Sequence, residues 1–159
     1  MRAFIDEVAE LERRRITCQP IPARWATLAT RADLNWQRFT FEAGATDQIP
    51  REPGFFCFFV GDPPATLPPV GFPLYFGRTD RTLRRRFAVY LLEQQDDATR
   101  PQVRDFLEIF EGELTFYCST FDGTPDQMSQ TAHDIIDALR PAFSDPEYIA
   151  EAQVGEGAW

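Results

Sequence analysis

The sequence predicts an α+β domain in which short strands and amphipathic helices follow one another along a single chain. Two very apolar segments, 55–60 and 74–77, are typical of strands and lead directly into a helix rich in arginine. A third strand-like segment, 113–121, is followed by a helix over 125–139 with one apolar side. A length of 159 residues with 43% apolar residues is enough for one domain with a single core.

The first fifty residues are predicted to form a helical N-terminal extension, 1–50, that packs on this core. Helical spacing of apolar residues predicts an amphipathic helix over 2–15, which the nearby prolines end: Phe4, Ile5, Val8, Leu11, Pro20 and Pro22. A second short helix is expected over 23–31. Alternating polarity over 36–42 indicates a strand.

The segment 54–90 carries the chemical signals. The strand 55–60 is continuously apolar, which predicts burial on both faces. Five prolines make 61–73 a loop, because proline cannot serve a central ladder. Thr79 or Asp80 is expected to cap the next helix, whose apolar stripe is Leu83, Phe87, Tyr90 and Leu91.

The C-terminal half is predicted to contain two helices and the third strand. One helix follows Pro101 and ends at Gly112, and the strand 113–121 ends at the Asp122-Gly123 turn. The last helix stops at Pro141, and 145–159 is expected to be an acidic tail.

Charge is distributed unevenly. The chain has a net charge of −9, yet 75–90 holds five arginines against one aspartate, a local charge of +4 on a body of −13. At about 100° per residue, Arg86 borders the apolar stripe beside Tyr90, whereas Arg84 and Arg85 turn toward solvent. The simplest interpretation is a solvated helix face. A basic patch of this kind is also able to face the phosphates of DNA.

The remaining composition narrows the class of protein. No apolar run approaches the roughly 18 residues of a membrane span, and acidic residues replace the apolar segment of a signal peptide, so we expect a cytoplasmic protein without a membrane partner. Cys18, Cys57 and Cys118 lack a CxxC pairing, and His133 is the only histidine. Reduced, buried thiols are therefore expected instead of a zinc site.

Four short sequence motifs resemble those of the GIY-YIG nuclease superfamily. They are closest in pattern to the nuclease domain of the bacterial excision-repair incision subunit. They are Gly54-Phe55-Phe56, Tyr75-Phe76-Gly77-Arg78, Leu83-Arg84-Arg85-Arg86-Phe87, and Ile135-Ile136 followed by Pro141. The likeness covers about 52–144, so we expect a domain over 51–144. The resemblance implies a small three-stranded antiparallel sheet flanked by helices.

In that family one divalent metal, Mg or Mn, supports hydrolysis of a DNA phosphodiester. By position, Tyr75 resembles the family's second-motif tyrosine, and Arg86 resembles the arginine that steadies charge on the phosphate. Tyr90 lies one helical turn after Arg86, and the resemblance implies that these three residues are catalytic. Arg78 resembles the nearby basic residue. Arg81, Arg84 and Arg85 complete the expected DNA-binding patch.

Two family positions are filled differently here. Phe56 replaces the first-motif tyrosine and lacks its hydroxyl, and Ala132 stands where the metal-binding glutamate belongs. Asp134 and His133 point elsewhere on that helix. The metal ligand is therefore unknown, with the other carboxylates Glu108, Glu111 and Asp122 as open candidates.

Three functions follow as hypotheses. The first is a nuclease-fold protein of DNA processing or defence, with a phosphate-facing patch and an incomplete metal-dependent site. The alternative is an inactive subunit that binds another protein through the acidic remainder and the N-terminal helix. The third is recognition of a nucleic acid without cleavage.

Overall fold

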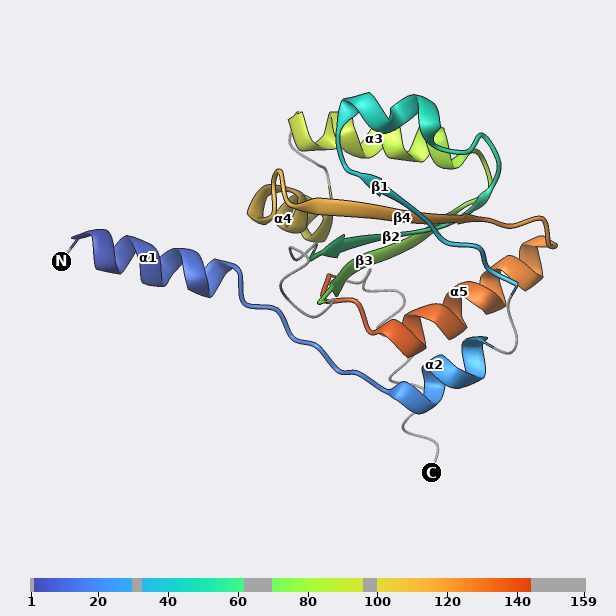
Figure 1. The fold of residues 1–159 in the computed structure, drawn as a ribbon, viewed down its shortest axis with the longest axis horizontal. Helices are drawn as coiled ribbons and strands as arrows, with labels where there is room; N and C mark the ends of the chain where they lie inside the picture. The colour runs from blue at the N-terminus through green and yellow to red at the C-terminus, as the bar shows by residue number, and fades with distance from the viewer. Residues whose placement is uncertain (1, 30–32, 62–69, 96–99, 144–159) are drawn as a thin grey trace.

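The computed structural model describes residues 2–29, 33–61, 70–95 and 100–143 (Figure 1). The acidic tail 145–159, the stretch 62–69 of the proline-rich loop and the end of the helix expected over 23–31 lie outside this part of the chain. In chain order the elements are α1 (Arg2–Arg13), α2 (Pro22–Ala29), β1 (Gln37–Thr40), the 3-10 helix η1 (Ala43–Gln48), β2 (Gly54–Val60), β3 (Phe72–Thr79), α3 (Leu83–Gln95), α4 (Pro101–Ile109), β4 (Leu114–Thr120) and α5 (Pro125–Leu139).

The strands form one antiparallel sheet in the order β1-β4-β2-β3, which confirms the α+β class. The sheet has four strands instead of the three expected. The fourth is β1, which comes from the segment predicted as an N-terminal extension and pairs with β4 from Gln37 opposite Cys118 to Thr40 opposite Thr115. Because β1 completes the sheet, this part of the first fifty residues belongs to the sheet itself and is not only packed upon it.

The central strand β2 is buried on both faces, as its continuous apolar sequence predicts. Phe55, Phe56, Cys57 and Phe58 expose at most 1% of their surface. Successive side chains of a strand point to opposite faces. Phe56 and Phe58 accordingly enter one core cluster and Phe55 and Cys57 the other.

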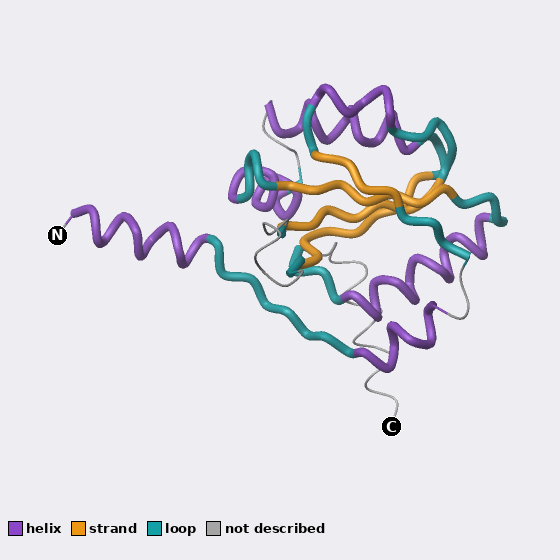
Figure 2. The backbone as a smooth tube through the Cα atoms, in the orientation of Figure 1, coloured by secondary structure: helices purple, strands orange, loops and turns teal. Residues whose placement is uncertain are grey.

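These two core clusters lie on opposite faces of the sheet. One is formed with α3, α4 and η1, and the other with α5 (Figures 1 and 2). We call them the α3 side and the α5 side. A site formed by residues of both α3 and α5 would therefore have to extend around an edge of the sheet.

The strand β3 is longer than predicted. Phe72 and Pro73 were assigned to the loop, but they begin the strand, opposite Val60 and Phe59. A register shift between Phe58 and Phe59 and the place of β3 at the sheet edge make this possible. Proline is tolerated at an edge or a bulge because its missing N–H leaves no central bond unmade.

Local capping residues define the helix starts. Thr124 caps α5 in a reciprocal capping box with Gln127, followed by Pro125. The cap of α3 is Thr82, whose hydroxyl accepts a hydrogen bond from the Arg85 N–H at 3.1 Å. The prediction of Thr79 or Asp80 as that cap is wrong, because the helix begins three residues after Asp80.

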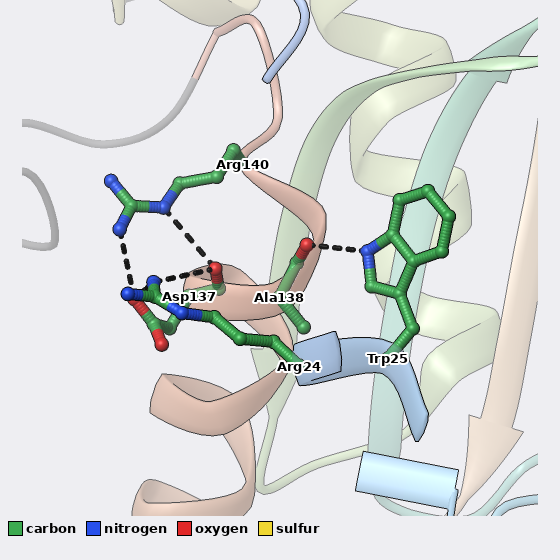
Figure 3. A network of polar contacts seen from close by, with 5 residues as sticks. All are labelled: Arg24, Trp25, Asp137, Ala138 and Arg140. Atoms are coloured by element: carbon green, nitrogen blue, oxygen red, sulfur yellow. Dashed lines mark hydrogen bonds and ion pairs between the residues drawn. The ribbon is translucent and has the colours of Figure 1, made fainter. Parts of the chain in front are cut away.

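The helix α2 is held against α5 by a polar network (Figure 3). Trp25 donates from Nε1 to the Ala138 carbonyl at 2.7 Å. Arg24 and Arg140 both reach the Asp137 carboxylate. These contacts hold α2 in place against α5.

The helix α1 is different, since it projects away from the sheet (Figures 1 and 2). Contact with the rest of the chain is made at its C-terminal end, where Arg13 pairs with Glu108 at 3.0 Å and Arg14 pairs with Glu113. The expectation that this helix packs on the core is not met by its apolar residues, which are exposed.

The three cysteines lie in two kinds of surroundings, two buried in strands and one exposed. Cys57 and Cys118 are buried free thiols, as predicted, and burial raises the pKa of Cys57 well above its usual value and that of Cys118 to about 12. Cys18 is a free thiol too, but it is exposed, because it lies in the connection between α1 and α2 and not in a strand. Within the described residues, no helix is long and apolar enough to cross a membrane.

Candidate functional site

The arginines predicted as one DNA-binding patch lie in three different surroundings. Arg78 faces the α5 side, where its Nη1 donates to the Ser129 hydroxyl at 2.6 Å. It lines a cavity of about 930 Å³ together with the carboxylates of Asp33, Glu52, Asp80, Asp122 and Asp126. An anion entering this acidic cleft would be repelled, so Arg78 is poorly placed to bind phosphate there.

Arg84 has a structural role that its sequence position did not indicate. Its Nε donates to the Ile49 carbonyl at 2.9 Å, and its Nη2 donates to the Asp47 carbonyl. These bonds tie α3 to the end of η1. Since its donors are already engaged, Arg84 is not part of a free phosphate-binding surface.

The other three arginines share one small cavity at the start of α3. This cavity, the arginine pocket, has a volume of about 270 Å³ and is lined by Thr79, Asp80, Arg81, Thr82, Arg85, Arg86 and Val89. Across the described ranges, no carboxylate forms an ion pair with Arg81, Arg85 or Arg86. Three guanidinium groups against Asp80 leave the pocket with positive charge.

The first three backbone N–H groups of α3 are already bonded within the protein and are not available to an anion in this pocket. The backbone N–H of Leu83 bonds to Glu52 O, and that of Arg84 bonds to Pro50 O, both at 2.9 Å. The Arg85 N–H bonds to Thr82 Oγ1. The start of α3 therefore has its first N–H groups satisfied by protein, and affinity for an anion must come from the arginines.

Arg86 connects the arginine pocket to the core. Its guanidinium carbon lies 5.7 Å from the centre of the Tyr90 ring, one helical turn on. Its Nε is buried without a hydrogen-bond partner in the described structure. A buried, unmatched donor is costly, so this N–H would gain from donating to an anion that reached it.

Behind the pocket, Tyr75 and Tyr90 form a tyrosine cluster with Arg100 and Glu93. Arg100 donates to both hydroxyls at 3.1 Å, and its Nη2 lies 3.7 Å from Glu93 Oε2. The tyrosines expose 2% and 0% of their surface. The structure thus brings Tyr75, Tyr90 and Arg86 to one side of the sheet, but it places both hydroxyls in the core.

The environment of Tyr90 disfavours its use as a base. Burial raises the pKa of its hydroxyl, and the opposing pull of Arg100, Tyr75 and Arg86 does not cancel that effect. For Arg100, burial works against the charged form, yet the neighbouring Tyr90, Tyr75 and Glu93 raise its pKa overall. At neutral pH the Tyr90 phenol is therefore protonated and lies beside the permanently charged Arg100.

Phe56, the residue that the sequence resemblance matches to the first-motif tyrosine, packs among the tyrosines of this cluster. Its ring packs within 6.4 Å of the Tyr75 ring centre and 5.5 Å of the Tyr90 ring centre. A Cβ built on Gly77 would lie 2.3 Å from Phe56 Cζ. Gly77 of the Tyr75-Phe76-Gly77 motif thus leaves room for the Phe56 ring because it has no side chain.

The position matched to the metal-binding glutamate lies elsewhere. Ala132 is fully buried in the α5-side cluster, across the sheet from Tyr75 and Tyr90. Among the other carboxylates considered, Glu108 pairs with Arg13, Asp122 lines the acidic cleft and Glu111 is exposed. In the part of the chain that is described, no group of three or more His, Cys, Asp or Glu residues is arranged to hold a metal ion.

Sequence reasoning missed Arg100 and Glu93. Glu93 had a signal, since it follows Arg86 by seven residues and Tyr90 by three and so shares their face of α3. Arg100 had none, because it precedes α4 and reaches Tyr75 across 25 residues of sequence. Its role depends on tertiary structure alone.

Comparison of the chain with protein-family models, with curated proteins and with solved structures gave no match. The resemblance to the GIY-YIG superfamily therefore rests on the four sequence motifs alone, and membership of that superfamily stays a prediction.

Proposed function

We propose that this chain is a GIY-YIG-like protein of DNA processing or defence that binds DNA phosphates through the arginine pocket. The observation that supports the proposal is the set of three guanidinium groups, from Arg81, Arg85 and Arg86, around a cavity of about 270 Å³. Guanidinium groups bind phosphate oxygens with planar, paired hydrogen bonds. The unmatched Nε of Arg86 adds a buried donor to that set.

Binding without efficient cleavage fits this arrangement best. A phosphodiesterase needs a positioned nucleophile and a cation on the transferring phosphate. Here the hydroxyls of Tyr75 and Tyr90 accept hydrogen bonds from Arg100 in the core, and Phe56 has no hydroxyl. Use of Mg or Mn stays a prediction of the resemblance.

The test is a binding measurement on the full-length chain with single-stranded, double-stranded and branched DNA over a series of salt concentrations. The double variant Arg81→Ala, Arg85→Ala should lose about three- to tenfold in affinity per arginine, and the slope of log affinity against log salt should fall by about one per arginine. The matched control is Arg104→Ala, an exposed arginine on α4 outside the pocket.

Failure of every DNA to bind at low salt would contradict the proposal, as would equal losses in the Arg81/Arg85 and Arg104 variants. The same samples incubated with Mg or Mn test cleavage. Strand scission that disappears in Arg86→Ala would establish the enzymatic form of the proposal. Binding without scission would establish recognition alone.

A further inference from the structure

The projecting helix α1 presents an apolar stripe that the described chain leaves uncovered. Its four members, Phe4, Ile5, Val8 and Leu11, are 69%, 60%, 42% and 64% exposed. At about 100° per residue they occupy roughly a third of the helix circumference. Single exposed apolar residues are ordinary, but a contiguous row on one helix face indicates an interaction surface.

The helix is presented in a defined direction. Arg13 pairs with Glu108, Arg14 pairs with Glu113, and the Arg14 guanidinium lies 5.1 Å from the centre of the Phe110 ring. Ile16, just after the helix, packs against the α3-side core. Anchoring at one end lowers the ordering cost that a partner would otherwise have to meet.

Three occupants of the stripe are disfavoured. A lipid surface selects helices with a basic polar face, whereas Arg2–Arg13 holds four carboxylates against two arginines. The chain's own segment 144–159 carries four carboxylates and no basic residue, so it matches this helix poorly in charge. A second copy of α1 would bury too little.

A symmetric pair of α1 helices would bury too little area for a stable interface. Each large apolar side chain offers on the order of 100 Å², so two stripes together bury about 800 Å², below the roughly 1,200 Å² of a stable interface. The arginine pocket and the acidic cleft of a second copy are lined mainly by polar and charged residues, so neither is a matching groove. A concave apolar groove on another protein covers both flanks of the helix and buries more.

We propose that α1 docks as a helix in the apolar groove of a different protein, with Phe4, Val8 and Leu11 as the anchors. The groove is about 18 Å long, the length of a twelve-residue helix. Asp6 and Glu7, which have no ion-pair partner within the described residues, meet a basic rim. This interaction is independent of the arginine pocket.

The experiment places a photoreactive benzophenylalanine at Val8 of the full-length chain in its own cells and maps the crosslinked peptides by mass spectrometry. The matched control carries the same probe at Ala3, which lies about 140° from the centre of the stripe. The expected result is one protein crosslinked at Val8, through residues of an apolar groove with basic neighbours, at roughly ten times the yield at Ala3. Adding Leu11→Asp should remove this adduct, whereas Ala3→Asp, with the probe at Val8, should not.

Several results would overturn the proposal. They are equal yields at the two probe positions, no adduct at Val8, or crosslinks to lipid or to a second copy of this chain. A purified chain that is dimeric by light scattering and becomes monomeric with Leu11→Asp would assign the stripe to self-association. Circular dichroism and thermal unfolding of Leu11→Asp check the fold, and unchanged unfolding is expected because the Leu11 side chain lies outside both cores.

Discussion

At the scale of single residues, Arg100 joins two buried tyrosines and a glutamate beside the core. It donates to both buried tyrosine hydroxyls and pairs with Glu93. Two guanidinium groups also share the Tyr90 ring, since Arg86 and Arg100 lie 5.7 and 5.6 Å from its centre. The cluster therefore links Arg100, the residue just before α4, to the arginine pocket.

Replacing Arg100 by leucine should lower the free energy of unfolding by about 2 kcal/mol or more, because two buried hydroxyls lose the hydrogen bonds that Arg100 donates. Urea unfolding measures the loss. In a double-mutant cycle with Tyr90→Phe, the two changes should cost about 1 kcal/mol less together than their sum. Arg104→Leu, an exposed arginine three residues past Pro101, serves as control and should stay within about 0.5 kcal/mol. An additive cycle would show that the observed hydrogen bond contributes nothing to stability.

The candidate site was predictable from sequence only where its signals were local. Helical spacing predicts that Arg86 lies beside Tyr90, and the guanidinium carbon lies 5.7 Å from the ring centre. Tyr75 is expected at the site only through the family resemblance, and it lies in the same core cluster as Tyr90. The role of Arg84 was not predictable, since its partner Asp47 lies 37 residues earlier in the sequence. The same limit hid Arg100.

At the scale of secondary structure elements, boundaries were predicted best where chemistry marks them. The helix α5 begins at Pro125 after the Thr124 cap and ends at Leu139 before Pro141, as expected. The strand that alternating polarity predicts over 36–42 is present as β1, but it has only four residues with a mostly exposed pattern, so no local signal places it in the sheet. Pairing with β4, about eighty residues later, decides its role.

The docking of α2 on α5 gives a prediction at this scale. Trp25→Phe keeps an aromatic ring but removes the Nε1 donor to the Ala138 carbonyl, so it should cost about 1 kcal/mol of unfolding free energy. Thermal unfolding followed by circular dichroism measures the change. Trp36→Phe alters a tryptophan just before β1 that is 36% exposed, and it should be close to neutral. Equal effects of the two substitutions would mean that the Trp25 bond is not formed in solution.

At the scale of the whole molecule, the N-terminal fifty residues behave as separate parts. The strand β1 extends the sheet, and α2 covers α5. The helix η1 supplies carbonyl groups to Arg84 and contacts α3. Only α1 has its large apolar residues outside both cores. Of these neighbouring segments, β1, α2 and η1 thus contribute to the fold, whereas α1 leaves its apolar residues exposed.

This division predicts that the fold and the arginine pocket survive without α1. A chain lacking residues 2–13 loses the Arg13–Glu108 pair, which is more than half exposed on both sides and worth at most about 1 kcal/mol. It keeps Arg14, Ile16 and both core clusters. Its free energy of unfolding should therefore lie within about 1 kcal/mol of the full-length value, and its affinity for DNA should be unchanged, since neither core uses α1. A parallel truncation through residue 29 removes Trp25 and the network on Asp137, and it should lower stability further. The contradicting result is a larger loss of unfolding free energy on removing residues 2–13 than the further loss on extending the truncation through residue 29. It would mean that α1 packs on the domain in solution and that its apolar stripe is part of the core.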